Sequence, residues 1–138
     1  MHAAGPRRFQ QAVFTVAALA FVAHLVDTVI SGTQPLTAEL DAAVASGGVA
    51  LAVAVNYSRI PPTAAASFAV LLGGPWLYGC LHYHVIPTFE RGLSPTDLSG
   101  IVAGVASLAL LAIGVPPLLQ VVRRRPPPAS EVAGHPLT

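Results

Sequence analysis

The sequence contains few charged residues, no lysine and a single cysteine. Only 9% of its 138 residues are charged, whereas 54% are hydrophobic. A soluble domain carries about 25% charged residues, so this chain lacks the charge needed to cover a water-facing surface. The lone Cys80 cannot form a disulfide within the chain. The net charge of +1 provides no field that would attract nucleic acid.

Long apolar segments dominate the chain instead. A helix that crosses the hydrocarbon core of a bilayer needs about 20 mostly apolar residues. Four segments meet this requirement, at about 10–30, 37–57, 63–86 and 95–122. An open sheet could not satisfy its backbone in lipid. Residues 1–125 are therefore predicted to form an all-α membrane domain, with four transmembrane helices in an antiparallel, up-down bundle.

Several helix ends are marked by local signals. Ser94 and Asp97 have the spacing of a capping box at the start of the fourth helix, and Thr37 can cap the second. Pro61–Pro62 cannot lie inside a helix, so they separate the second helix from the third. The proline-rich segment 126–138 is predicted to be disordered.

The arginines predict the orientation of the bundle. Loops on the cytoplasmic side of a membrane are enriched in basic residues. With four spans, one side of the membrane receives Arg7, Arg8, Arg59, Arg123, Arg124 and Arg125. The other side receives only Arg91. Both termini of this multi-pass protein are therefore expected in the cytoplasm, with the bundle in the cell membrane.

A cleaved signal peptide is the alternative reading of the N-terminus. Arg7-Arg8 precede an apolar run, and Ala43-Val44-Ala45 fits a cleavage pattern. The run is longer than the 7–15 residues of a signal-peptide core, and the cleavage pattern lies inside a second apolar segment. We therefore expect the first segment to remain as a helix.

Small residues at four-residue spacing predict where helices meet, because they allow backbones to approach closely in lipid. The rows are Ala42, Ser46, Ala50 and Ala54 in the second helix, Ala65, Ala69 and Gly73 in the third, and Gly100 and Gly104 in the fourth. Their partners can belong to the same chain or to another copy. Gly73 and Gly74 before Pro75 predict a kink in the third helix.

Ionisable residues inside membrane spans are rare and are candidates for function. His24 and Asp27 lie three residues apart, on one face of the first helix. His82 and His84 lie near the outer end of the third helix, about 200° apart around its axis, so both cannot face one point. Glu90 follows in the outer loop, as a possible lid.

We expect His82 to be the partner of His24, because Tyr78 and Pro75 share its face and a kink would open space there. His84, which shares a face with Cys80, is the alternative. Histidines with a carboxylate can bind a transition metal or haem, so His24, His82 and His84 are the candidate ligands. They can also relay protons. The competing interpretation is an interfacial belt of polar and aromatic side chains that includes Trp76.

Two classes of function follow from these features. The first is a non-catalytic accessory subunit or self-associating bundle, whose partners are the bilayer, other membrane subunits or itself. The second is a redox, metal, haem or proton-handling protein that uses the His/Asp cluster. An oligomeric transporter is a third, weaker reading. No complete catalytic or cofactor motif is present, so the sequence favours a protein that is not an enzyme and requires no cofactor.

Overall fold

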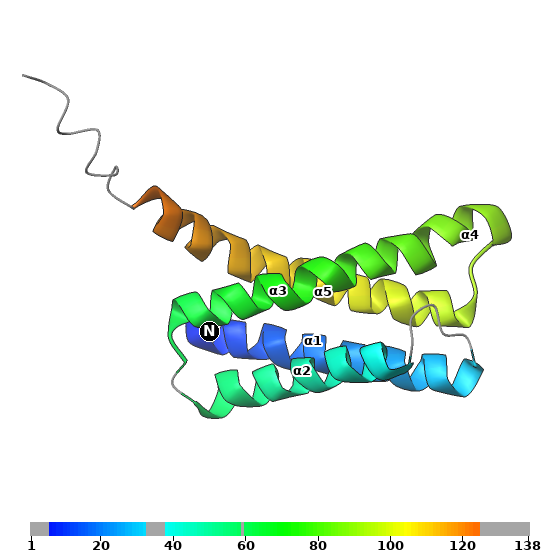
Figure 1. Cartoon of the computed structure of the whole chain (residues 1–138), viewed down its shortest axis with the longest axis horizontal. Helices are drawn as coiled ribbons and strands as arrows, with labels where there is room; N and C mark the ends of the chain where they lie inside the picture. Colours follow the sequence, from blue (N-terminus) through cyan, green and yellow to red (C-terminus); the bar gives the residue numbers. More distant parts are fainter. Residues whose placement is uncertain (1–5, 33–37, 59, 125–138) are drawn as a thin grey trace, which may run out of the picture.

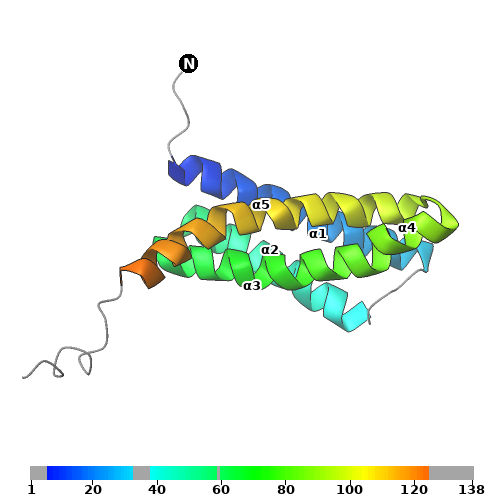
Figure 2. The same cartoon turned by 90° about the horizontal axis from the view of Figure 1, so that it is seen from above.

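The computed structural model describes residues 6–32, 38–58 and 60–124, which form helices joined by short connections. The helices are α1 (Pro6–Ser31), α2 (Ala38–Tyr57), α3 (Pro62–Cys80), the π-helix η1 (Leu81–Val85), α4 (Ile86–Arg91) and α5 (Pro95–Arg123). Because α3, η1 and α4 follow one another without a break, the described chain has four rods that alternate in direction (Figure 1, Figure 2). No strand occurs among the described residues, and the all-helical prediction is confirmed.

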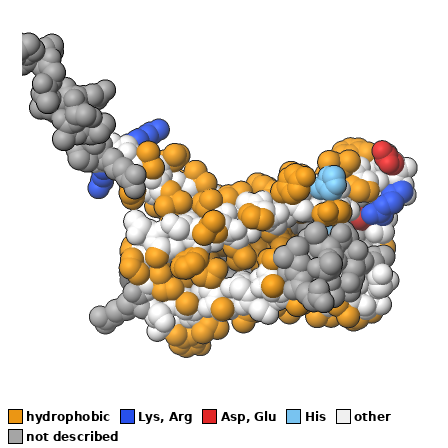
Figure 3. Space-filling view, in the orientation of Figure 1, with side chains coloured by type: hydrophobic (Ala, Val, Ile, Leu, Met, Phe, Trp, Pro, Cys, Tyr) orange, Lys and Arg blue, Asp and Glu red, His pale blue; other side chains and the backbone are white. Residues whose placement is uncertain are grey.

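Three of the four rods are long and apolar enough to cross a membrane: Arg7–Ser31, Pro62–Arg91 and Pro95–Arg123. The apolar stretch of α2 is shorter, Ala42–Tyr57. Large apolar side chains face outward on all four rods, and Figure 3 shows hydrophobic atoms spread along the visible face, with charged atoms toward its ends. Monomeric soluble proteins rarely expose continuous apolar surface on this scale. The fold is thus compatible with a membrane protein.

The start of α5 carries the predicted capping box. The Asp97 backbone N–H donates to the Ser94 hydroxyl at 3.3 Å, and the Ser94 backbone N–H donates to the Asp97 carboxylate at 2.9 Å. The preceding turn uses Gly92, whose φ of 79° is accessible to glycine at little cost. This confirms the capping box read from the sequence. Thr37 and the segment 126–138 lie outside the described residues.

The third rod is longer than expected. We expected it to end near residue 86, but it continues through Pro87 to Arg91. In a regular α-helix, the ring of Pro87 would clash with the carbonyl four residues earlier. The π-turn of η1 avoids this clash, because the Ile86 backbone N–H bonds to the Leu81 carbonyl, five residues back. π-Turns occur frequently at functional sites. The rod also passes through Gly73, Gly74 and Pro75 within α3, where the kink remains a prediction.

Close packing between α3 and α5 forms the most extensive contact of the bundle. A Cβ atom added at Gly73 would lie 2.9 Å from the Ser107 carbonyl oxygen, and one at Gly114 would lie 2.8 Å from the Ala66 carbonyl oxygen. Nearer to the start of α5, a Cβ at Gly100 or Gly104 would overlap a side chain of the third rod. The two backbones therefore approach each other at positions where side chains are missing.

The small-residue row of α2 does not take part in this packing. Ala42, Ser46 and Ala50 are exposed, and Ala54 is only partly buried. The helix faces α1 through Gly48 instead, where an added Cβ would lie 3.0 Å from the Phe21 ring. The reason is the size of Phe21, which is fully buried and needs a neighbour without a side chain. The row therefore contacts no other helix of its own bundle extensively.

Candidate functional site

Two histidines from distant parts of the sequence meet inside the bundle. His24 of α1 is 4% exposed and His84 of η1 is 5% exposed. Their ring centroids lie 4.8 Å apart, with the planes at 88°. Trp76 of α3 lies edge-on to His24 at 5.9 Å, and Gly100 of α5 leaves the space that the His84 ring occupies. Three rods thus enclose His24 and His84, which we call the histidine pair.

A serine connects His24 to a carboxylate. The Ser99 hydroxyl lies 3.0 Å from His24 Nδ1, 2.5 Å from Asp27 Oδ2 and 2.9 Å from the Thr96 carbonyl oxygen. The carbonyl oxygen can only accept and the Asp27 oxygen serves as the acceptor here, so the hydroxyl proton goes to one of them. Ser99 then accepts from His24. His24 Nδ1 therefore carries the ring hydrogen, and Nε2 keeps a lone pair.

The other ring, His84, is held by Asp97, whose side chain is almost completely buried. His84 Nδ1 lies 3.4 Å from Asp97 Oδ1, and the guanidinium of Arg91 donates to both oxygens of the same carboxylate at 2.8 Å. Ser94 adds its hydroxyl at 2.6 Å. A carboxylate paired with a guanidinium accepts hydrogen bonds and donates none. His84 Nδ1 therefore also carries its hydrogen, and its Nε2 also keeps a lone pair.

The two Nε2 atoms are the unusual feature of the site. Neither has a hydrogen-bond partner among the described residues, although both rings are more than nine-tenths buried. Buried polar atoms are nearly always satisfied. A neutral imidazole whose Nδ1–H is fixed by an oxygen is the form that binds metal ions through Nε2. In the described part of the chain, no three His, Cys, Asp or Glu residues are grouped to hold a metal ion, so the pair offers two nitrogen ligands.

The spacing of the rings distinguishes between possible occupants. With metal–nitrogen bonds of 2.0–2.1 Å, two imidazoles on opposite sides of one ion have centroids roughly 6 Å apart, and two at a tetrahedral angle roughly 5 Å apart. The observed 4.8 Å, with the planes at 88°, is close to the shorter of these two values, so one ion could bind both rings only if the two Nε2 atoms turn toward it. The same spacing is too short for a haem plane between the rings, so axial haem ligation by His24 and His84 does not fit this geometry.

The structure corrects our choice of partner for His24. His82, which we preferred, is exposed and stacks on exposed Tyr78, with centroids 5.9 Å apart. His84 and Cys80 are both buried. As the helical spacing predicts, His82 shares a face with Tyr78, and His84 shares a face with Cys80. The face that is turned toward α5 is the one with Cys80 and His84. The physical reason is space, because Gly100 and Gly104 accommodate His84 and Cys80. Glu90 is exposed and makes no hydrogen bond or ion pair with the histidine pair.

Four residues of the site are not predicted as site residues by the sequence. The sequence indicates a helix cap for Asp97, an interfacial belt for Trp76 and a loop charge for Arg91, and it carries no prediction for Ser99. The sequence signal that could have placed Asp97 in the site is the order of the helices along the chain. The capping box places Asp97 in the first turn of α5, and only a short connection separates α5 from the third rod. The Asp97 carboxylate can therefore cap α5 and also reach a side chain near the end of the third rod.

Comparison with known proteins gives no further guidance. No protein-family model, curated protein or solved structure matches this chain.

Proposed function

We propose that this chain is an integral membrane protein with four spans and with both termini on the cytoplasmic side. The antiparallel order of the rods brings Arg7, Arg8, Arg123 and Arg124 to one end of the bundle, here called the arginine end. The opposite end carries Asp27, Glu90, Arg91 and Asp97. Positive charge concentrates on the cytoplasmic side, which supports this orientation. The 20 residues of α2, of which Ala42–Tyr57 form the apolar stretch, extend over about 30 Å, which is the thickness of the hydrocarbon core.

Reporter fusions test this topology. Reporters fused after residue 34 and after residue 92 should report the outer side, because both positions fall between rods at the end opposite the arginines. A reporter after residue 124 should report the cytoplasm. A cytoplasmic signal at residue 34 or residue 92 would contradict the four-span arrangement.

The histidine pair supports a function within this bundle, namely binding of a divalent transition-metal ion. The observation that carries this proposal is the two buried lone pairs, which have no hydrogen-bond donor among the described residues. Imidazole nitrogen suits zinc, copper and nickel. Asp97 is already paired with Arg91, whereas Asp27 has no cationic partner among the described residues. The Asp27 carboxylate therefore offsets part of the charge that a bound cation would bring into the bundle.

Two protein ligands leave coordination positions for water or for another molecule. Structural zinc sites are closed by four protein ligands, whereas sites that act on a ligand keep a position open. The histidine pair therefore suits a protein that holds a metal ion transiently or presents it to a partner.

The single tryptophan of the chain provides the test. Cu²⁺, Ni²⁺ and Zn²⁺ are titrated into protein purified without a histidine tag, and the emission of Trp76 is recorded. The ring centroids of Trp76 and His24 lie 5.9 Å apart, so bound Cu²⁺ should quench the emission of Trp76. The quenching should saturate at one ion per chain. Emission that does not change, together with no ion retained after desalting, would contradict the metal proposal.

A second candidate function is a non-catalytic accessory subunit or self-associating bundle. The observation that favours it is the outward-facing row of α2, Ala42, Ser46 and Ala50, since such rows are used where helices meet in lipid. Ala50→Leu should then weaken association between copies, measured by cross-linking in membranes or by size in detergent. Ala12→Leu, at an exposed position on α1, serves as the control. Equal association in both variants and the parent would argue against an interface on α2.

A further inference from the structure

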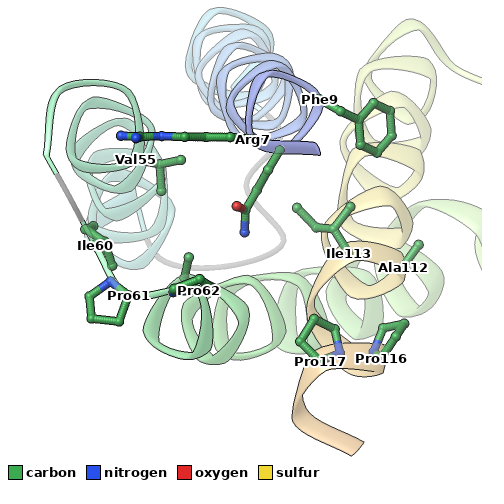
Figure 4. Close-up of a pocket in the computed structure, with 12 residues that line it drawn as sticks. Arg7, Phe9, Val55, Ile60, Pro61, Pro62, Ala112, Ile113, Pro116 and Pro117 are labelled. Atoms are coloured by element: carbon green, nitrogen blue, oxygen red, sulfur yellow. The ribbon is translucent and has the colours of Figure 1, made fainter. Parts of the chain in front are cut away.

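A crevice opens at the arginine end, far from the histidine pair. Its volume is about 780 Å³, within the range of small-molecule sites. Residues of α1, α3, α5 and the end of α2 line it, and Figure 4 shows Ile60, Pro61, Pro62, Ile113 and Pro117 around the space. The walls are mostly apolar.

Two pairs of prolines explain why the helices do not close over this space. At Gly114 the backbone of α5 still touches α3, since an added Cβ would lie 2.8 Å from the Ala66 carbonyl oxygen. Beyond that contact come Pro116 and Pro117, which remove backbone hydrogen bonds and bend helices. Figure 1 shows the last turns of α5 leaving the other helices. On the facing side, Pro61 and Pro62 start α3 and limit how closely α2 and α3 can approach.

Two polar side chains line the otherwise apolar crevice. Neither Arg7 nor Gln10 has a hydrogen bond or ion pair with another described residue. The neighbouring Gln11 differs, because its amide donates to the Val55 carbonyl at 3.3 Å. Figure 4 shows the Arg7 side chain extending from α1 toward Val55 of α2, across the edge of the crevice. A guanidinium that has no partner in the described part of the chain and lies beside apolar walls matches a ligand with an anionic head and an alkyl chain.

The geometry points to a binding site for one anionic phospholipid of the surrounding bilayer. One acyl chain lies between the apolar walls, the phosphate pairs with the Arg7 guanidinium, and the Gln10 amide donates to an oxygen of the headgroup or ester. Basic pockets between transmembrane helices on the cytoplasmic side are suited to anionic headgroups. This inference rests on the proposed membrane placement and orientation, and it is independent of the metal proposal.

Native mass spectrometry of the purified protein tests the site. The protein in detergent is mixed with equal amounts of phosphatidylglycerol and phosphatidylcholine of the same acyl chains. One phosphatidylglycerol molecule should be retained in preference. Arg7→Gln should reduce that preference about fivefold, the effect of roughly 1 kcal/mol for one basic group at an anionic lipid. Arg8→Gln removes the same charge from the next residue, which does not line the crevice, and should leave the preference unchanged.

A second variant tests the apolar part. Ala112→Phe places a ring in the crevice from α5 and should reduce retention of both lipids, while circular dichroism confirms that the helices remain. Glycerol 3-phosphate at the same concentration should not displace the lipid, because it lacks the chain. The site is ruled out by equal retention of the two lipids, by equal effects of Arg7→Gln and Arg8→Gln, or by full retention in Ala112→Phe.

Failure of this inference can be distinguished from failure of the proposed function. The reporter fusions test membrane placement without added lipid, and the Trp76 titration reports on the opposite end of the bundle. His24→Ala should leave lipid retention unchanged. A correct topology with no lipid preference would overturn only the lipid site proposed in the crevice.

Discussion

Replacing His24 or His84 with alanine is expected to abolish the metal-dependent quenching of Trp76. Each ring supplies one of the two Nε2 lone pairs, so either variant leaves a single imidazole. The loss of affinity should exceed the roughly 10–100-fold that follows when a group that only orients a metal-binding histidine is removed. The measurement is the Cu²⁺ titration of Trp76 emission, supported by metal analysis after desalting.

His82→Ala is the matched control for these variants. It removes the same side chain from the same π-helix, but His82 is exposed and stacks on Tyr78. Its affinity should equal that of the parent protein. If His82→Ala weakens binding as much as His84→Ala, the metal binds at the surface and the buried pair is not its site.

Asp27→Asn examines the carboxylate behind His24. Asp27 touches Ser99 and not the Nε2 atom of His24, so it is a positioning residue. Asp27→Asn should weaken metal binding by about 10–100-fold. Ser99→Ala should have a similar effect, because it breaks the same connection between Asp27 and His24. A structural role alone would lower thermal stability in both variants without changing the affinity of the folded protein.

The sequence contained the information needed to choose between His82 and His84. The row of Ala65, Ala69 and Gly73 continues at helical spacing to Trp76, Cys80 and His84, and all six are buried. Extending that row would have selected His84. The kink expected at Pro75 favours His82 instead, because it would open space on the face of that residue. The deciding factor was the space that Gly100 and Gly104 leave in α5, which is a property of two helices together.

Other parts of the site depend on contacts that periodicity within one segment does not reveal. Four apolar segments and the capping box of Ser94 could be read locally, because each depends on neighbours in the sequence. The link from Ser99 to Asp27 joins residues 72 positions apart, and it depends on how α1 and α5 are rotated against each other. The continuation of the third rod through Pro87 depends on a π-turn, which no pattern within the segment predicts.

Gly73→Ala is expected to destabilise the bundle, whereas Gly74→Ala is expected to leave it unchanged or stabilise it. An added Cβ at Gly73 would lie 2.9 Å from the Ser107 carbonyl oxygen and 3.2 Å from the Leu110 Cβ. A backbone oxygen cannot rotate away, so α3 and α5 must separate. Overpacking of this kind costs about 1–3 kcal/mol in the free energy of unfolding.

Gly74 is the matched control because it is the next residue and has nothing within 4 Å of its added Cβ. Alanine there replaces a poor helix former with a good one, worth up to about 1 kcal/mol in water. Thermal unfolding in detergent, followed by circular dichroism, should therefore place Gly73→Ala below the parent and Gly74→Ala at or above it. Separation of α3 from α5 would also lengthen the 3.4 Å contact between His84 and Asp97, so Gly73→Ala should bind Cu²⁺ more weakly. Equal stability of the two variants would show that α3 does not pack on α5 through Gly73.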